Sequence, residues 1–205
     1  MKKATNAGVR KFLVLVCTVI GMTSMYAQDA REIIDAARNR IDAQTVSTRS
    51  QMVLESKGTV TGERLIDQYS RDTPEGNRTI IVFQKPATVA GTRFLTMEKK
   101  NSDDDRWIFL PSLGKVRRIA ASEGSGSFMG TDLSYDDISS TDREVSLDTH
   151  TLLREESLSG KVCHVIESIP IDKDYQYSKM ISWIDKESFV AWKIELYGKN
   201  GELVK

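Results

Sequence analysis

The chain has 205 residues and balances 29 basic side chains against 29 acidic ones. Four of the basic residues and none of the acidic ones lie among the first 27 residues, so residues 28–205 have a net charge of −4. This balance excludes general electrostatic binding to nucleic acid, because there is no basic excess to neutralise phosphates. The length of residues 28–205 suits one domain with a sizeable core.

The first 27 residues are typical of a cleavable export signal. A basic start leads into an apolar stretch from Phe12 to Met22, which is too short to span a bilayer because spanning takes roughly 20 apolar residues. A cut after Ala27 would release the rest of the chain into the periplasm. The alternative is a lipid anchor on Cys17, although Val16 is bulky where a lipoprotein signal has a small residue.

One helix is predicted, over Asp29–Asp42. Asp29 has the side chain of an N-cap, and Glu32 follows three residues later. The apolar residues recur at helical spacing and form a single stripe, made of Ala30, Ile33, Ile34, Ala37 and Ile41.

From Thr45 onward the apolar residues recur at every second position, which predicts strands. After a first strand that includes Val46 to Leu54, we expect strands at Glu63–Ser70, Arg78–Gln84, Thr92–Lys99, Arg106–Leu110, Val116–Ala120, Val162–Ile169, Lys179–Asp185 and Phe189–Tyr197, with a weaker one near Glu144–Arg154. In the last strand the alternation places Trp192 with Ile194 on one face and Ala191 with Lys193 on the other.

The order of elements predicts a mainly β (α+β) fold. We expect a large curved antiparallel sheet that forms a half-open barrel, with the N-terminal helix against its concave face. Asn200-Gly201 predicts one more hairpin turn, and only four residues follow it. Such a short last strand would leave an exposed edge, so we expect either further C-terminal strands or a partner at that edge.

Several predicted strands carry apolar residues on both faces, as in Ile80–Phe83 and Trp107–Leu110. One face would pack as core and the other would line an apolar cavity. The candidate cavity residues in strands are Phe83, Leu95, Trp107, Phe109, Trp183 and Trp192.

A loop rich in Gly and Ser follows the sixth predicted strand. Gly124–Gly130 has the spacing G-x-G-x-x-x-G, which fits neither the dinucleotide fingerprint nor the nucleophile elbow. Two interpretations stay open: a flexible connection, or a mobile flap that holds Phe128 and Met129 over the cavity.

A basic pair and a group of carboxylates flank this loop. Arg117 and Arg118 either form ion pairs with Asp132, Asp136 or Asp137, or clamp an anionic lipid headgroup at the cavity mouth.

The two histidines, His150 and His164, are expected to be structural. Cys163 and His164 are adjacent on a strand, so their side chains point to opposite faces and cannot chelate one metal. The spacing along the chain indicates no Ser/His/Asp arrangement, although such a triad can also be assembled in space. We therefore expect no catalytic residue, no metal and no cofactor.

Seven short motifs follow one another in a recognisable order: Gln84-Lys85-Pro86, Gly91-Thr92, Phe94-Leu95, Trp107–Pro111, Arg117–Ile119, Ser127–Asp132 and Ser134–Asp137. In this order the chain resembles the outer-membrane lipoprotein-sorting protein family, which includes the periplasmic carrier LolA and its receptor LolB. The resemblance covers about Val46 to Lys205. It implies a half-open barrel with helices as a lid over an apolar cavity.

The resemblance also implies a function. It indicates a non-enzymatic periplasmic carrier that binds lipid or the acyl chains of lipoproteins and helps to sort them to the outer membrane, with a membrane transporter or an outer-membrane receptor as partner. Such a carrier is useful because an acyl chain exposed to water loses about 0.8 kcal/mol per CH₂. The alternatives are an accessory partner of a lipid-exporting transporter and a lipid-modifying enzyme.

Overall fold

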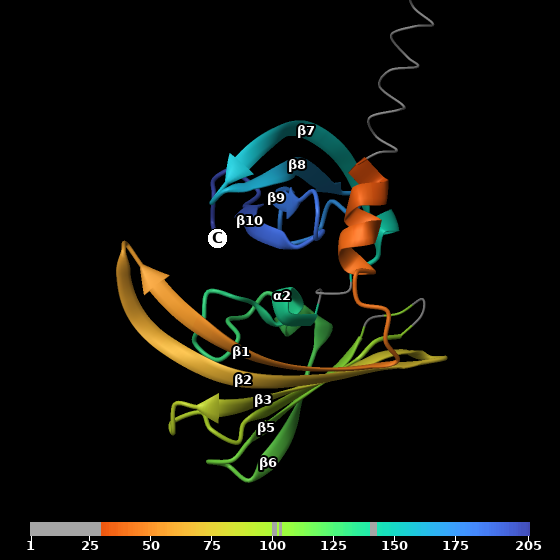
Figure 1. The fold of residues 1–205 in the computed structure, drawn as a ribbon. Helices are drawn as coiled ribbons and strands as arrows, with labels where there is room; N and C mark the ends of the chain where they lie inside the picture. Colours follow the sequence, from red (N-terminus) through yellow and green to blue (C-terminus); the bar gives the residue numbers. More distant parts are fainter. Residues whose placement is uncertain (1–29, 100–101, 103, 140–142) are drawn as a thin grey trace, which may run out of the picture. The chain divides into compact units, whose positions relative to one another are not determined.

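Figure 1 shows the fold of the chain in a computed structural model, which describes residues 30–99, 102, 104–139 and 143–205. The predicted export signal, with Cys17 and Ala27, lies outside these residues. The chain divides into two compact units. We call Asp42–Asp142 the six-stranded unit, and we call the residues up to Ile41 together with Arg143–Lys205 the four-stranded unit.

The six-stranded unit is an antiparallel sheet in which every strand pairs with its neighbour in the sequence. Its strands are β1 (Thr45–Ser56), β2 (Thr59–Thr73), β3 (Gly76–Lys85), β4 (Arg93–Met97), β5 (Asp105–Leu110) and β6 (Lys115–Ile119). Lys57 and Gly58 both have positive φ, the backbone geometry of a tight two-residue hairpin turn between β1 and β2. Strands β1 to β3 bend along their length, so the sheet has a concave face (Figure 1).

Alternation along the strands sorts the side chains of this sheet onto two faces. The buried members of the concave face are Ile66, Ile81, Phe83, Phe94, Ile108 and Ile119, and they form one core cluster. The chain that follows β6 folds over this face through a 3₁₀ turn, η1 (Ala121–Glu123), and a short helix, α2 (Tyr135–Ser139) (Figure 1). We call residues 120–139 the covering segment.

The four-stranded unit contains a second antiparallel sheet in the order β10-β9-β8-β7. Its strands are β7 (Asp148–Leu158), β8 (Lys161–Pro170), β9 (Lys179–Asp185) and β10 (Ala191–Tyr197), and the 3₁₀ turn η3 (Val145–Leu147) precedes β7. A helix over residues 30–38 packs Ala30 and Ile34 against Ile166 and Ile184 of this sheet. None of the helices in the described residues is long and apolar enough to cross a membrane.

The predicted fold class is confirmed: the chain is mainly β and antiparallel, with a curved sheet and one N-terminal helix. The strands divide between two hydrogen-bonded sheets, whereas we expected one. The helix packs on the four-stranded sheet, and the covering segment takes the concave face of the six-stranded one. The predicted hairpin at Asn200-Gly201 is present, because Leu203 bridges to Tyr197 beside β10.

Candidate functional site

The concave face of the six-stranded sheet holds a cluster of four aromatic rings. Phe128, from the covering segment, is 0% exposed. Its ring centroid lies 5.6 Å from that of Phe83, 5.1 Å from that of Phe94 and 5.6 Å from that of Tyr135. The tilted and edge-on ring arrangements are those that aromatic pairs prefer. Phe128 is therefore a central core residue and does not stand at an opening.

The loop that carries Phe128 is compact and is closed by its own hydrogen bonds. Ser127 bridges to Ser134, and the Phe128 amide donates to the Leu133 carbonyl at 2.7 Å. The Thr131 hydroxyl donates to the Phe128 carbonyl at 2.7 Å. Met129 and Gly130 both have positive φ, which reverses the chain direction directly after Phe128.

A charged contact fixes the covering segment to the sheet. Arg106 of β5 shares the inward face with Ile108, and its side chain is only 13% exposed. Its Nη1 donates to Oδ1 of Asp136, at the start of α2, at 2.5 Å. The Asp136 carboxylate rests against Gly124, where an added Cβ would lie 2.2 Å from Oδ1. Glycine at this position thus makes room for the carboxylate.

The predicted cavity residues do not share one face. Phe83 lies on the concave face with Phe128, and Met129 packs against the same cluster. Leu95, Trp107 and Phe109 are half-buried on the opposite, convex face, where Leu95 pairs with Trp107 across β4 and β5.

The two remaining candidates belong to the four-stranded unit. Trp183 is buried with Cys163 and Val165, and the Lys193 ammonium lies 4.4 Å from its ring centroid. Trp192 is 54% exposed. The structure therefore brings together only Phe83, Phe128 and Met129 of the eight predicted residues.

The predicted ion pairs also have other partners than expected. Arg117 binds Glu123 of the covering segment at 2.6 Å, and Arg118 binds Asp105 at 2.5 Å. The backbone amide of Ala120, and next the Arg117 guanidinium, lower the pKa of Glu123. Asp132 is exposed and forms no ion pair with any described residue. The carboxylate that does lie in the site, Asp136, is held by Arg106.

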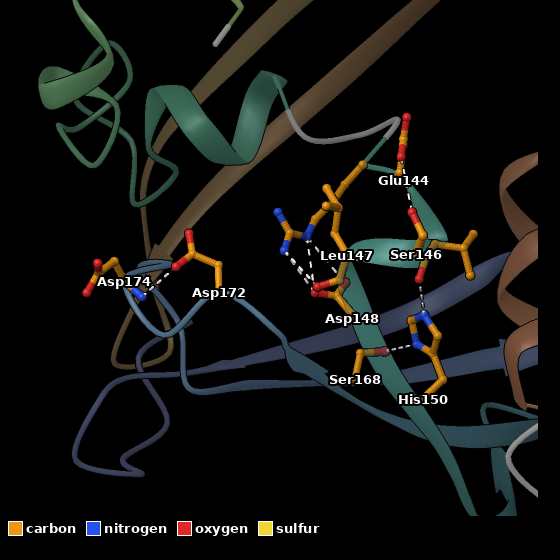
Figure 2. A network of polar contacts seen from close by, with 10 residues as sticks. Glu144, Ser146, Leu147, Asp148, His150, Ser168, Asp172 and Asp174 are labelled. Carbon is orange, nitrogen blue, oxygen red and sulfur yellow. Dashed lines mark hydrogen bonds and ion pairs between the residues drawn. The ribbon is translucent and has the colours of Figure 1, made fainter. Parts of the chain in front are cut away.

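A second polar network lies at the start of β7 in the four-stranded unit (Figure 2). The His150 ring is bound on both nitrogens, with Nδ1 2.8 Å from the Ser168 hydroxyl and Nε2 3.0 Å from the Val145 carbonyl. Burial lowers the pKa of His150. The Asp148 side chain is 0% exposed and pairs with Arg143 at 2.9 Å. His150 thus has a hydrogen-bond partner on each ring nitrogen.

Sequence reasoning missed two important residues of the site, Arg106 and Tyr135. Arg106 offered a signal, because the alternation within Arg106–Leu110 places it on the same face as the buried Ile108. A charged residue at an inward position requires a partner of opposite charge, so the pattern predicts a carboxylate near Arg106. Tyr135 belongs to the motif Ser134–Asp137, but it lies outside any periodic strand, so the alternation gave no reason to place it at the concave face.

The comparisons with known proteins agree with this architecture. A family model that describes uncharacterized proteins matches residues 75–205, which is more than half of the chain. A DUF1329 family protein from Desulfovibrio piger has 29% sequence identity and a TM-score of 0.77, over 87% of this chain and 76% of that one. No curated protein matches the chain.

Two further solved structures bear the sorting name. An outer membrane lipoprotein-sorting protein domain from Vibrio parahaemolyticus has 30% identity and a TM-score of 0.73, over 86% of this chain and 75% of that one. A LolA superfamily protein from Nitrosomonas europaea shares the fold at 23% identity and a TM-score of 0.52, over 85% of this chain and 74% of that one.

These relatives define the class of the protein, a mainly β protein with the fold of the lipoprotein-sorting domain. The chain belongs to the outer-membrane lipoprotein-sorting protein family, as its motifs indicated.

Proposed function

We propose that this protein is a periplasmic carrier that shields lipid, or the acyl chains of a lipoprotein, on the concave face of its six-stranded sheet. The observation that carries the proposal is the burial of Phe128. A single aromatic side chain from a segment outside the sheet fills the middle of an apolar surface built by five strands. An acyl chain, like the Phe128 ring, is unfavourable in water, and the same apolar surface could bury it.

The energetics favour an exchange between the covering segment and a ligand. Burying a side chain such as Phe contributes about 1.5–3 kcal/mol, which equals the burial of roughly two to four CH₂ groups. A longer acyl chain therefore offers the sheet more apolar surface than Phe128 does. Exchange of this kind breaks no covalent bond, and release needs only a second site that binds the lipid more tightly.

We propose a carrier and not an enzyme, because the Ser–His pair of the four-stranded unit is engaged in packing. Ser168 and His150 are both buried, and the other contact of the ring is a backbone carbonyl where a catalytic triad has a carboxylate. The proposed partners are a membrane transporter that loads the carrier and an outer-membrane receptor that unloads it, in keeping with the lipoprotein-sorting relative.

A reversible lock on the covering segment tests the proposal. The Thr96 hydroxyl of β4 lies 3.3 Å from the Ser139 hydroxyl of α2. Two cysteines at these positions would tie the segment to the sheet. We expect the oxidised Thr96→Cys/Ser139→Cys protein to bind the fluorescent fatty acid cis-parinarate at least about tenfold more weakly than the same protein after reduction.

The matched control is the single variant Thr96→Cys, in which oxidant and reductant should change binding little. Buried Cys163 is replaced by Ser in all forms so that no other thiol of the described chain takes part. Equal binding by the oxidised and reduced double variant would show that the acyl chain does not use the surface beneath the covering segment, and would overturn the proposal.

A further inference from the structure

Arg106 is an unusual residue for the floor of an apolar site. It lies on the inward face of β5, paired with Thr96 on one side and Ile119 on the other, and both of these neighbours are buried. Its Nε atom is buried and has no hydrogen-bond partner within the described part of the chain. Because a buried charged donor is costly without an acceptor, Nε is a group to which a bound anion could supply one.

The covering segment supplies the charge that Arg106 does have. Asp136 accepts one hydrogen bond from Nη1, and its backbone amide donates to the Gly124 carbonyl at 2.9 Å. Asp104 comes only within 3.9 Å of Nη2. One guanidinium edge is thus occupied by a carboxylate that enters from outside the sheet.

The same segment therefore places two groups on the sheet, an apolar ring and an anion. Phe128 lies against Phe83 and Phe94, and Asp136 lies on Arg106, which is next to Ile108 along the same face. An apolar body joined to a single anionic group is the chemical pattern of an anionic lipid.

We propose that the covering segment is an internal mimic of the ligand, and that Arg106 is the binding residue for the anionic group of the bound lipid. This inference rests on the proposed function and specifies its ligand as an acyl chain that carries one carboxylate or phosphate. Arginine suits either group, because its planar fork donates two parallel hydrogen bonds. Binding would exchange the Asp136 carboxylate for the lipid anion and give Nε an acceptor.

The neighbouring arginines are less suited to this role. Arg117 points to the same face, but its side chain is half-exposed and bound to Glu123. Arg118 follows it on the convex face, where it binds Asp105. Arg118 is for this reason a matched control, since it is an arginine of the same sheet in a salt bridge of the same length but away from the site.

Three probes with the same chain length separate charge from apolar burial: oleate, oleyl phosphate and oleyl alcohol. Their affinities are measured by displacement of cis-parinarate from the full chain. The variant Asp136→Asn removes the internal anion, so oleate and oleyl phosphate should bind about three- to tenfold more tightly, and oleyl alcohol should change less. Adding Arg106→Gln to Asp136→Asn makes the pair neutral again. Relative to Asp136→Asn alone, it should weaken the binding of the two anions about tenfold or more, while the affinity for oleyl alcohol should stay within about twofold.

Gly124→Ala gives an independent arm that changes no charge. The added Cβ occupies the place of the Asp136 carboxylate, so this variant should also raise the affinity for the two anionic probes. Arg118→Gln should leave all three affinities within about twofold of wild type. The anion that loses more affinity in the double variant identifies the preferred group, carboxylate or phosphate.

The proposal fails if Arg106→Gln with Asp136→Asn weakens oleyl alcohol as much as the anions, or weakens none of the probes. In both cases the three probes still bind, so the result contradicts the anion site at Arg106 but not the carrier function. If no probe displaces cis-parinarate from the wild type or from the reduced lock variant, the carrier function itself falls, and this inference falls with it.

Discussion

The two sheets of this protein each bury one face, but the covers are of different kinds. A regular helix over residues 30–38 covers the four-stranded sheet through Ala30 and Ile34. The six-stranded sheet is covered by residues 120–139, which contain only two short helical turns. The second cover depends on a few large side chains. A single substitution in it should therefore remove a large part of its contribution to stability.

The backbone hydrogen bonds of the covering segment are compatible with the proposed exchange. The amides of Phe128, Tyr135 and Asp136 donate to Leu133, Gly126 and Gly124, which all belong to the segment itself. Contact with the sheet is made by side chains, chiefly Phe128, Tyr135 and the Arg106–Asp136 pair. Release of the segment, as the proposed function requires, would leave these backbone hydrogen bonds intact.

The largest expected effect is on the six-stranded unit. Phe128→Ala should lower its free energy of unfolding by about 3–5 kcal/mol, because a fully buried ring is lost from the cluster. Urea unfolding followed by the fluorescence of Trp107, with Trp183 and Trp192 replaced by Phe, reports on this unit. Leu113→Ala, at an exposed turn, should cost less than about 0.5 kcal/mol. Equal losses in the two variants would show that Phe128 does not hold the core.

The corresponding change in the other unit is Ile34→Ala. We expect a loss of about 2–4 kcal/mol from the four-stranded unit, since Ile34 is the larger of the two buried residues that pack the helix on the sheet. Trp183, as the only remaining tryptophan, reports the transition. Ile41 was predicted on the same apolar stripe but is exposed beyond the end of the helix, so Ile41→Ala should cost little. A large loss at Ile41 would contradict the observed helix boundary.

Acidification should destabilise the four-stranded unit more than the six-stranded unit. Both histidines lie in the four-stranded unit, and burial lowers the pKa of each below its ordinary value of 6.5. The unfolded chain then takes up protons first as the pH falls below about 6.5, so stability is lost with falling pH until the lowered folded-state pKa is reached. Between pH 7.5 and 5.5 the midpoint reported by Trp183 should fall more than that reported by Trp107.

The control for this pH effect is the double variant His150→Gln/His164→Gln. Its Trp183 midpoint should vary with pH in this range no more than the Trp107 midpoint does. A pH dependence that persists without the histidines would assign the effect to other groups.

The smallest expected effect concerns the convex face. Arg118 is largely exposed, and its salt bridge to Asp105 should contribute little to stability. Arg118→Gln should therefore leave the Trp107 midpoint nearly unchanged, whereas Arg106→Gln leaves Asp136 largely buried without its partner and should lower the midpoint clearly. Similar effects of the two substitutions would mean that burial does not distinguish these pairs.

The strands were predictable because alternation is a local property. The expected segments Lys179–Asp185 and Arg106–Leu110 correspond to β9 and β5 within one residue. The expected strand near Glu144–Arg154 begins later, at Asp148, because Val145–Leu147 forms a 3₁₀ turn. In β10 the register shifts between Ala191 and Lys193, which places Ala191 opposite Ile184 and on the same face as Ile194. Simple alternation had placed Ala191 with Lys193, since a bulge adds one residue that the pattern does not reveal.

The sequence by itself determined the family, the mainly β class and the position of nearly every strand, because these depend on motifs and on spacing between neighbours. Only the tertiary structure decided which face is inside. Trp107 and Ile108 are adjacent and both apolar, so the pattern could not tell which of them joins Phe128. The pairing of Arg106 with Asp136 was equally out of reach, because the two residues are thirty positions apart and meet only when the covering segment folds back onto the sheet.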